Sequence, residues 1–322
     1  MTKRIKKTRN EILKRNDFLV VPHINPDADA VSAAAFLVAY LSSKNKRVYA
    51  KYEGSISPRY EDHIAFLEEH AYKGETVSNV VFLDCTSPDR ARMEVPDGAY
   101  VFNIDHHESN TAFGDQNEIH PESSSTCEIL YDMFYGKGAG IDPFMKKCII
   151  TGILGDTGFL KYDNATSATF LAFSVLLKDM NIFEIYKKYY ISMTLDHFKT
   201  FADLVRAMRN EGDIYYLVMR YETLRASHVT YDDISELLSW FRTLRDAEIF
   251  VFFREFEKDR VRINFRGNND TDLNVLAGLF GGGGHRNAAA AYMEGDPEEI
   301  ASKIIPMIKD HLKGHERDTP GR

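Results

Sequence analysis

The chain has little cysteine, no long apolar run and no excess of positive charge. Its 322 residues include 3 cysteines, too few and too scattered for a disulfide framework or a cysteine-rich zinc site. No apolar run approaches the roughly 20 residues that a membrane span needs. The basic residues near the start are not followed by an apolar stretch with a cleavage site, as a signal peptide requires. These absences predict a cytoplasmic protein with reduced thiols and no contact with a membrane.

The charge balance limits which phosphate-bearing partners are plausible. The formal net charge is −8, whereas binding to a long nucleic acid depends on many contacts of Lys and Arg with phosphates. A phosphate substrate must therefore be short, or be captured locally by metal ions and a few cations. The basic cluster at residues 3–9 is better explained as the solvated face of a first helix than as a phosphate site.

Short apolar runs alternate with helical stretches in the first part of the chain. Alternation of this kind predicts an α/β fold with a parallel sheet covered on both faces. We expect strands at residues 18–21, 47–52, 79–83 and 100–104, and helices at 30–41, 58–70, 124–134, 142–154 and 166–178.

The pattern is helical from residue 182 to residue 209 and then changes, which indicates a second, smaller α/β domain. There we expect strands at 213–219, 248–256, 260–265 and 288–292, and helices at 233–240, 273–280 and 297–312. The predicted organisation is an N-terminal domain at 1–185, a helical linker at 186–209 and an accessory domain at 210–322. A cleft is expected between the two domains.

Aspartate and histidine residues follow three of the predicted strands. The segment HINPDADA at 23–30 follows the first strand, Asp84 follows the strand at 79–83, and a DHH triplet follows the strand at 100–104. Asp156 lies just after the helix at 142–154. Ligands bind at the carboxyl ends of strands in an open parallel sheet, so these side chains should meet there: His23, Asp27, Asp29, Asp84, Asp105, His106, His107 and Asp156.

Carboxylates gathered in this way repel one another, by roughly 4 kcal/mol per pair at about 4 Å and an effective dielectric near 20. Only protons or cations relieve this repulsion. Oxygen ligands mixed with imidazole suit Mn²⁺, Mg²⁺ or Fe²⁺ better than sulfur-rich sites do. A single Asp after a strand is usually a turn former or a helix cap, and Asp29 could cap the helix at 30–41. The joint occurrence favours a metal site.

A run of four glycines, Gly281 to Gly284, precedes His285 and Arg286. Residues without a Cβ let backbone N–H groups approach a phosphate closely. The alternative is a flexible loop or a cap at the end of the helix at 273–280. Arginines on or beside a neighbouring strand, Arg262 and Arg266, are candidates for a second phosphate contact.

Two further positions have competing interpretations. Residues 124–126 (Ser-Ser-Thr) stand just before a helix, where a capping role is favoured over a role in the site. Arg90 either contacts a phosphate or pairs with Asp89.

Taken together, these motifs resemble the DHH phosphoesterase superfamily, which is named for the triplet at 105–107. The segment at 23–30, the isolated Asp84 and the GDTG segment at 155–158 occur in the order typical of that family. The glycine-rich segment resembles the signature of the family's accessory domain. The similarity extends roughly from residue 18 to residue 312 and is greatest to the nano-RNase branch, whose oligoribonucleases also act as pAp phosphatases.

The resemblance implies a site with two divalent ions, Mn²⁺ first and Mg²⁺ or Fe²⁺ as alternatives. His23, Asp27 and Asp84 would bind one ion. Asp29, Asp84, His106 and Asp156 would bind the other, with Asp84 shared. His107 would face the phosphate, and Asp105 would orient the histidines.

The resemblance also implies the substrates. We expect hydrolysis of RNA of about two to five nucleotides to mononucleotides, together with pAp phosphatase activity. The alternatives are cyclic or linear dinucleotides (cyclic di-AMP or pApA), inorganic pyrophosphate, and an inactive nucleotide-binding regulator. The acidic balance argues against long nucleic acid, and a homodimer is a further hypothesis.

Overall fold

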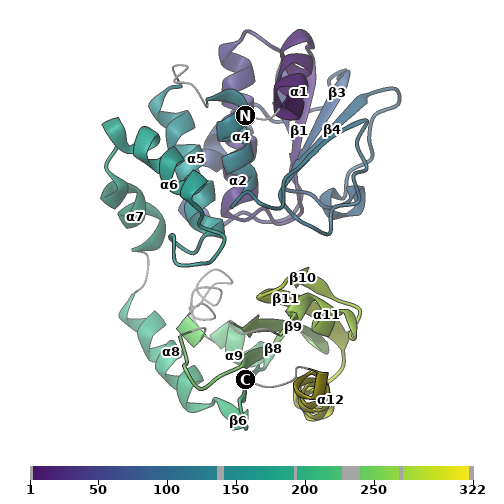
Figure 1. Cartoon of the computed structure of the whole chain (residues 1–322), viewed down its shortest axis with the longest axis vertical. Helices are drawn as coiled ribbons and strands as arrows, with labels where there is room; N and C mark the ends of the chain where they lie inside the picture. The colour runs from purple at the N-terminus through teal and green to yellow at the C-terminus, as the bar shows by residue number, and fades with distance from the viewer. Residues whose placement is uncertain are drawn as a thin grey trace. The chain divides into compact units, whose positions relative to one another are not determined.

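The structure is a computed structural model that describes residues 3–135, 141–191, 194–226, 240–241, 243–267 and 271–318. The chain divides into two compact units, Met1–Ser192 and Met193–Arg322. Figure 1 labels their helices and strands.

The first unit contains a five-stranded sheet in the order β2-β1-β3-β4-β5, and all of its strand pairs are parallel. Its elements, in chain order, are α1 (Lys3–Lys14), β1 (Phe18–Pro22), α2 (Ala28–Ser43), β2 (Val48–Ala50), the 3₁₀ turn η1 (Pro58–Tyr60), α3 (Glu61–Glu69), β3 (Asn79–Leu83), η2 (Pro88–Ala91), β4 (Tyr100–Asp105), β5 (Gln116–Ile119), α4 (Thr126–Phe134), α5 (Pro143–Asp156), α6 (Ser167–Leu176), η3 (Leu177–Asp179) and α7 (Ile182–Tyr190).

The helices of this unit gather on one face of the sheet. Alternate residues of the strands, among them Phe18, Val81 and Ile104, belong to one apolar core with α2, α4 and α5, and Figure 1 shows these three helices together beside the strands. The opposite face packs against connecting segments that include Cys85 and Ala91. We expected the sheet to be covered on both faces, as in folds with helices on each side. Here the second cover is made by connections, because β3 and β4 are joined through η2 and not through a long helix.

The second unit contains a six-stranded sheet in the order β10-β11-β9-β8-β7-β6, in which only β7 and β8 pair in parallel. Helices α11 and α12 cover one face, and α8 together with Phe241 packs on the other. Its elements are α8 (Leu195–Arg206), β6 (Arg209–Glu211), β7 (Ile214–Met219), α9 (Tyr221–Ala226), β8 (Ile249–Glu257), β9 (Arg260–Gly267), α11 (Leu273–Gly278), β10 (Gly283–His285), β11 (Ala288–Glu294) and α12 (Pro297–Asp318).

The predicted α/β class and the parallel N-terminal sheet are confirmed. The segment predicted as a linker contains the last turns of α7, in the first unit, and α8, in the second. Most of the helix predicted at 233–240 lies outside the described residues. Strands β5, β6 and β10 were not predicted. Among the described helices, none is both long enough and apolar enough to cross a membrane.

Candidate functional site

Three strand ends bring acidic and imidazole side chains to one edge of the first sheet. β1 ends immediately before His23, β3 ends immediately before Asp84, and β4 ends at Asp105. Because these strands are adjacent and parallel, their carboxyl ends lie side by side. Asp84 has a φ of 54°, a left-handed conformation that costs free energy in a residue with a Cβ and that clusters at functional sites.

The first group of side chains at this edge consists of His23, Asp27 and Asp84. The Nε2 atom of His23 lies 3.7 Å from Asp27 Oδ2 and 3.5 Å from Asp84 Oδ2. Its Nδ1 atom lies 2.8 Å from the carbonyl oxygen of Ile24, a contact that orients the ring. Asp27 is also the N-cap of α2, since its Oδ1 accepts hydrogen bonds from the first turn of that helix. One oxygen of Asp27 therefore caps the helix while the other faces His23.

The second group consists of Asp29, His106 and Asp156. The Nε2 atom of His106 lies 3.0 Å from Asp156 Oδ2 and 3.5 Å from Asp84 Oδ1. Asp29 is fully buried, and its carboxylate approaches His106 and Asp156 within 4.8 Å. The sequence left open whether Asp29 caps α2. Asp27 makes that cap, which leaves the Asp29 side chain to the cluster.

The amino terminus of α4 holds Asp29 in place. The N–H groups of Thr126 and Cys127 donate to its Oδ2 and Oδ1 at 2.7 Å and 3.0 Å. The Thr126 hydroxyl donates to Asp84 Oδ1 at 3.2 Å. Ser125 is the N-cap of α4. The cap interpretation of residues 124–126 thus holds for Ser125, whereas Thr126 contacts two carboxylates of the cluster.

The Asp105 carboxylate is already saturated with donors from the chain. Its Oδ1 accepts the N–H groups of His106 and His107 at 2.8 Å and 3.2 Å and lies 2.7 Å from His107 Nδ1. Its Oδ2 accepts Asn110 Nδ2 at 2.5 Å. Three contacts thus converge on Oδ1 and one on Oδ2, so both oxygens of the carboxylate face groups of the chain. This geometry suits an orienting role better than metal binding.

Two glycines allow α5 to bring Asp156 to the cluster: Gly155 of the GDTG segment, and Gly152, which the sequence motifs did not include. A Cβ at Gly152 would lie 2.3 Å from Cys127 Sγ and 2.6 Å from Asp29 Oδ1, and a Cβ at Gly155 would lie 2.4 Å from a side-chain atom of α2. Close-packed interiors do not accommodate such overlaps. The only signal in the sequence was two glycines three residues apart on one helix face.

Replacing Gly152 by alanine should therefore displace Asp29 and loosen the packing of α5. We expect a loss of about 1–3 kcal/mol in the free energy of unfolding and weaker metal binding. The matched control is Gly278→Ala, because a Cβ there meets no atom within 4 Å and should be neutral or slightly stabilising. Thermal unfolding and metal titration of both variants measure this. Equal behaviour of the two would contradict the packing argument.

In the absence of cations the cluster favours bound protons. Burial raises the pKa of Asp29, and the charges of Asp156 and Asp84 raise it further. Burial also raises the pKa of Asp156 to about 6, against the opposing effect of His106. Burial lowers the pKa of His23 and His106, but the facing carboxylates outweigh it and the net pKa of both is raised. At Asp84 the surrounding histidines outweigh burial, and its pKa is lowered.

The donor set fits divalent cations. His and Asp side chains form the two groups above and a third that joins them, and within each group the ligand atoms lie within 4.8 Å of one another. The third group consists of Asp84, Asp105, His106 and His107. All of these ligands are carboxylate oxygens or imidazole nitrogens, the combination that Mn²⁺, Mg²⁺ and Fe²⁺ accept. Cations would relieve the mutual repulsion of the buried carboxylates more effectively than a few protons do. The cluster can therefore hold metal.

The glycine run of the second unit has a structural explanation. The N–H groups of Gly281, Gly282 and Gly284 donate to Gly278 O, Ala277 O and Asn274 Oδ1 respectively. A Cβ at Gly282 would lie 2.2 Å from the carbonyl oxygen of a residue of β11, and one at Gly284 would lie 2.5 Å from another. The first two hydrogen bonds close the end of α11, as the helix-cap alternative predicts. Three of the four backbone N–H groups of the run are therefore used within the domain, and a role of Gly281 to Gly284 in substrate binding stays a prediction.

The other candidates of the second unit lie on or near β9 and β11. Arg262 and Arg266 are four residues apart on β9. Because side chains alternate along a strand, both point to the same face of the sheet. The Arg262 guanidinium stacks on Tyr292 with 5.5 Å to the ring centroid, and Arg266 Nη1 donates to the carbonyl oxygen of Phe265. Arg286 is exposed. The side chain of His285 lies outside the described residues.

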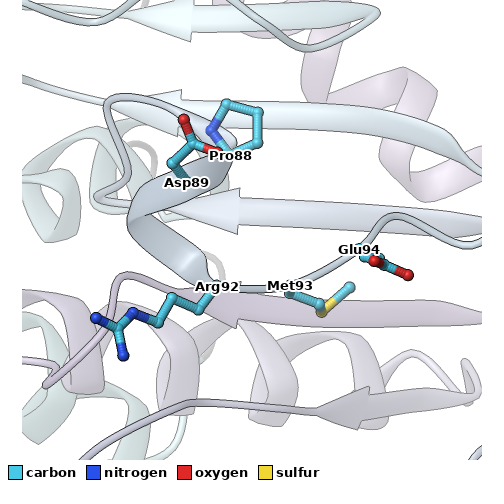
Figure 2. A pocket seen from close by; sticks show the side chains of 5 residues that line it. All are labelled: Pro88, Asp89, Arg92, Met93 and Glu94. Atoms are coloured by element: carbon cyan, nitrogen blue, oxygen red, sulfur yellow. The ribbon is translucent and has the colours of Figure 1, made fainter.

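The loop after β3 contributes a contact and a shallow depression. The carbonyl oxygen of Arg90 accepts the N–H of Ile24 at 2.7 Å, which ties η2 to the first motif. Both interpretations of the Arg90 side chain stay predictions. Figure 2 shows the depression beside η2, of about 360 Å³, and none of its lining residues belongs to the cluster: Pro88, Asp89, Arg92, Met93 and Glu94.

Known proteins share this arrangement of motifs. The family described as "DHH family, N-terminal domain" matches residues 17–153, and the "DHHA1 domain" matches residues 213–313. A bifunctional oligoribonuclease and PAP phosphatase NrnA of Thermus thermophilus is 24% identical over 315 residues, with 94% of this chain and 93% of that protein covered. The protein of the same name from Bacillus subtilis is 26% identical over 303 residues, with 90% of this chain and 94% of that protein covered.

Among solved structures, an exopolyphosphatase-related protein from Bacteroides fragilis superimposes with a TM-score of 0.83 at 22% identity. The superposition covers 98% of this chain and 99% of that one, and it supports the same fold. The two family matches follow one another along the chain and together span about three quarters of it. The chain therefore contains an N-terminal domain of the DHH family followed by a DHHA1 domain.

Proposed function

We propose that this protein is a metal-dependent phosphodiesterase that hydrolyses short RNA oligonucleotides to mononucleotides and that also removes a phosphate from pAp. The observation that carries the proposal is that the two oxygens of the Asp84 carboxylate face different groups of side chains. Its Oδ2 faces His23 and its Oδ1 faces His106, so one buried residue belongs to two groups of ligands. A shared carboxylate of this kind is what a pair of metal ions requires.

The proposed ligands follow the two groups. His23, Asp27 and Asp84 would hold one divalent ion, and the second would be held by the remaining side chains together with Asp84: Asp29, His106 and Asp156. Mn²⁺ is the proposed metal, with Mg²⁺ and Fe²⁺ as alternatives, since all ligands are oxygen or imidazole. When bound, such ions polarise phosphate oxygens and lower the pKa of water.

The residues of the chain supply the orientation and the charge around the reacting phosphate. His107 is partly exposed at the edge of the cluster, and its Nδ1 lies 2.7 Å from Asp105. This contact fixes the ring, so that the opposite side of the imidazole can face a phosphate oxygen and stabilise charge that develops there. The buried Asp105 holds His107 and does not contact the substrate.

Short substrates are supported by two observations. The relatives from Thermus thermophilus and Bacillus subtilis are named oligoribonuclease and PAP phosphatase. The net charge of −8 gives little general attraction to a long polyanion. A few cations of the DHHA1 domain would then hold the part of the substrate that does not react, with Arg266 the leading residue and Arg262, Arg286 and His285 as further candidates.

Replacing Arg266 by alanine should raise KM about tenfold with a smaller effect on kcat, because a lost charged contact is worth about 1.5–3 kcal/mol in binding. The matched control is Arg260→Ala on the same strand, since Arg260 pairs with Glu257 at the surface. Steady-state kinetics on pApA measure both variants. An unchanged KM for Arg266→Ala, or equal effects of the two, would contradict a substrate role.

Metal binding should weaken as the pH falls. The pKa of Asp156 is raised to about 6, so this carboxyl is increasingly protonated below that pH. Burial and the charges of Asp156 and Asp84 raise the pKa of Asp29 as well. Protons must then leave before a cation binds, and the raised pKa values of His23 and His106 add to this competition. We expect the apparent Kd for Mn²⁺ to rise about tenfold or more between pH 7.5 and pH 5.5. Calorimetry in two buffers should show proton release, and a Kd independent of pH would contradict this.

The proposed function is tested by offering several substrates in parallel. Purified protein with Mn²⁺ receives pApA, RNA of about 24 nucleotides, pAp, cyclic di-AMP and pyrophosphate. We expect the highest kcat/KM for pApA, measurable turnover of pAp and little action on the long RNA. Preference for pyrophosphate or for the long RNA would overturn the proposal, and preference for cyclic di-AMP would favour second-messenger turnover.

Two expectations from the sequence stay part of this proposal. The cytoplasm is the expected location, and a homodimer is the expected assembly. Light scattering of the purified protein tests the assembly.

A further inference from the structure

Asn110 lies three residues after the DHH triplet, and its side-chain amide uses all of its hydrogen-bonding groups. Its Oδ1 accepts the N–H of Ala112 at 2.7 Å. Its Nδ2 donates to the carbonyl oxygen of Cys85 at 3.0 Å and to Asp105 Oδ2 at 2.5 Å. Because an acceptor and two donors are all matched, this orientation of the amide is strongly preferred over the flipped one.

The contacts of Asn110 connect two of the strand ends that carry the cluster. Cys85 follows Asp84 at the end of β3, and Asp105 is the last residue of β4. The amide therefore bridges the backbone beside the shared carboxylate of Asp84 and the carboxylate of the DHH triplet. Both polar atoms of the amide thus face other groups of the chain.

Asp105 lies between Asn110 and His107 and contacts both side chains. With Oδ2 held by Asn110, the carboxylate plane is fixed, and Oδ1 is presented to His107 Nδ1 at 2.7 Å. Without the amide, the Asp105 carboxylate keeps only the contacts of Oδ1, so its plane can turn about that oxygen and the ring of His107 is held less firmly. Partners of this kind fix the tautomer and the orientation of a functional imidazole.

We propose that Asn110 is a positioning residue, which acts on the reaction through Asp105 and His107 and touches neither metal nor substrate. This inference rests on the proposed function, in which His107 faces the reacting phosphate. It adds a residue to the site from outside the motifs recognised in the sequence.

The first test compares Asn110→Ala, Asn110→Asp and Thr111→Ala. Thr111 tethers the same loop through its hydroxyl to the carbonyl oxygen of Thr86, without contacting Asp105, so its variant should keep wild-type kcat. We expect Asn110→Ala to lower kcat about 10- to 100-fold with KM within about threefold. Asn110→Asp, which is nearly isosteric, should lose at least as much because it places an oxygen against two acceptor oxygens.

A double-mutant cycle separates positioning from a general loss of structure. If Asn110 acts through His107, adding Asn110→Ala to His107→Ala should change kcat by less than about threefold. A further 10- to 100-fold loss in that background would overturn the inference. A kcat of Asn110→Ala equal to that of the wild type would also overturn the inference.

A spectroscopic readout on the metal-free protein does not depend on activity. Burial lowers the pKa of His107, but Asp105 and Asp84 outweigh it and raise the pKa, so the spectra are recorded at alkaline pH, where the ring is neutral. Long-range ¹H–¹⁵N correlation spectra should then show one tautomer of His107, protonated at Nδ1, in the wild type and in Thr111→Ala. In Asn110→Ala and Asn110→Asp the signals should average between tautomers. If the wild type hydrolyses none of the substrates, the proposed function fails and these spectra alone decide on the positioning. Unchanged spectra in both Asn110 variants would overturn it.

Discussion

Replacing Asp84 by asparagine is expected to abolish hydrolysis of every substrate, with a loss of at least about 1000-fold in kcat. Asp84 is 3% exposed, and its two oxygens face both groups of ligands, Oδ2 toward His23 and Oδ1 toward His106. Removing its charge should therefore weaken both proposed metal positions at once. Asparagine is the right replacement because it tolerates the left-handed backbone that Asp84 adopts.

The control for this variant is Asp179→Asn, which removes an exposed carboxylate paired with Lys146 and should leave activity unchanged. Mn²⁺ should raise the melting temperature of the wild type, because a ligand that binds only the folded state stabilises it. The same addition should have little effect on Asp84→Asn. Full turnover by Asp84→Asn, or an equal thermal shift, would show that the cluster is not the site.

Replacing His107 by alanine should lower kcat by about 100- to 10,000-fold while Mn²⁺ still binds. The Nδ1 atom of His107 faces Asp105 at 2.7 Å, so the ring is directed by a carboxylate that is itself held by backbone N–H groups and by Asn110. We expect the Kd for Mn²⁺ to stay within about threefold of the wild-type value.

The matched variant is His106→Ala, because His106 Nε2 lies 3.0 Å from Asp156 and 3.5 Å from Asp84. That variant should lose metal binding together with activity. Calorimetric titration with Mn²⁺ and kinetics on pApA separate the two histidines. The roles proposed for them are wrong if His107→Ala loses its metal or if His106→Ala keeps it.

The strand ends of the cluster could be predicted because local pattern and position agree there. The segments at 79–83 and 100–104 are compact apolar runs, and each is followed at once by Asp or His. In a parallel sheet such runs are buried and their carboxyl ends meet. The structure has β3 at Asn79–Leu83 and β4 at Tyr100–Asp105. The positions of these two strand ends could therefore be predicted from the sequence pattern alone.

Strand β5 shows where local pattern fails. Its sequence, QNEI, has no apolar alternation, and its Glu118 is fully buried. The carboxylate accepts a hydrogen bond from Thr8 of α1 and lies 3.0 Å from His120 Nε2. A polar strand in this position is stabilised by hydrogen-bond partners that are distant in sequence. The strand propensity of its own residues does not reveal such partners.

In the second unit, too, the local sequence pattern was not enough to predict what the residues do. Four glycines in a row predict a close approach of backbone N–H groups to a phosphate, but contacts with α11 occupy the N–H groups of Gly281, Gly282 and Gly284. Gly152 and Asn110 were missed for a related reason. Their importance depends on which atoms approach them in three dimensions.

Anomalous diffraction from crystals grown with Mn²⁺ tests the central claim most directly. Two peaks should flank Asp84, one beside His23 and Asp27 and the other beside Asp29, His106 and Asp156. Data collected at the manganese edge that show no peak at this end of β1, β3 and β4, or peaks bound only by other side chains, would contradict the proposed two-metal site.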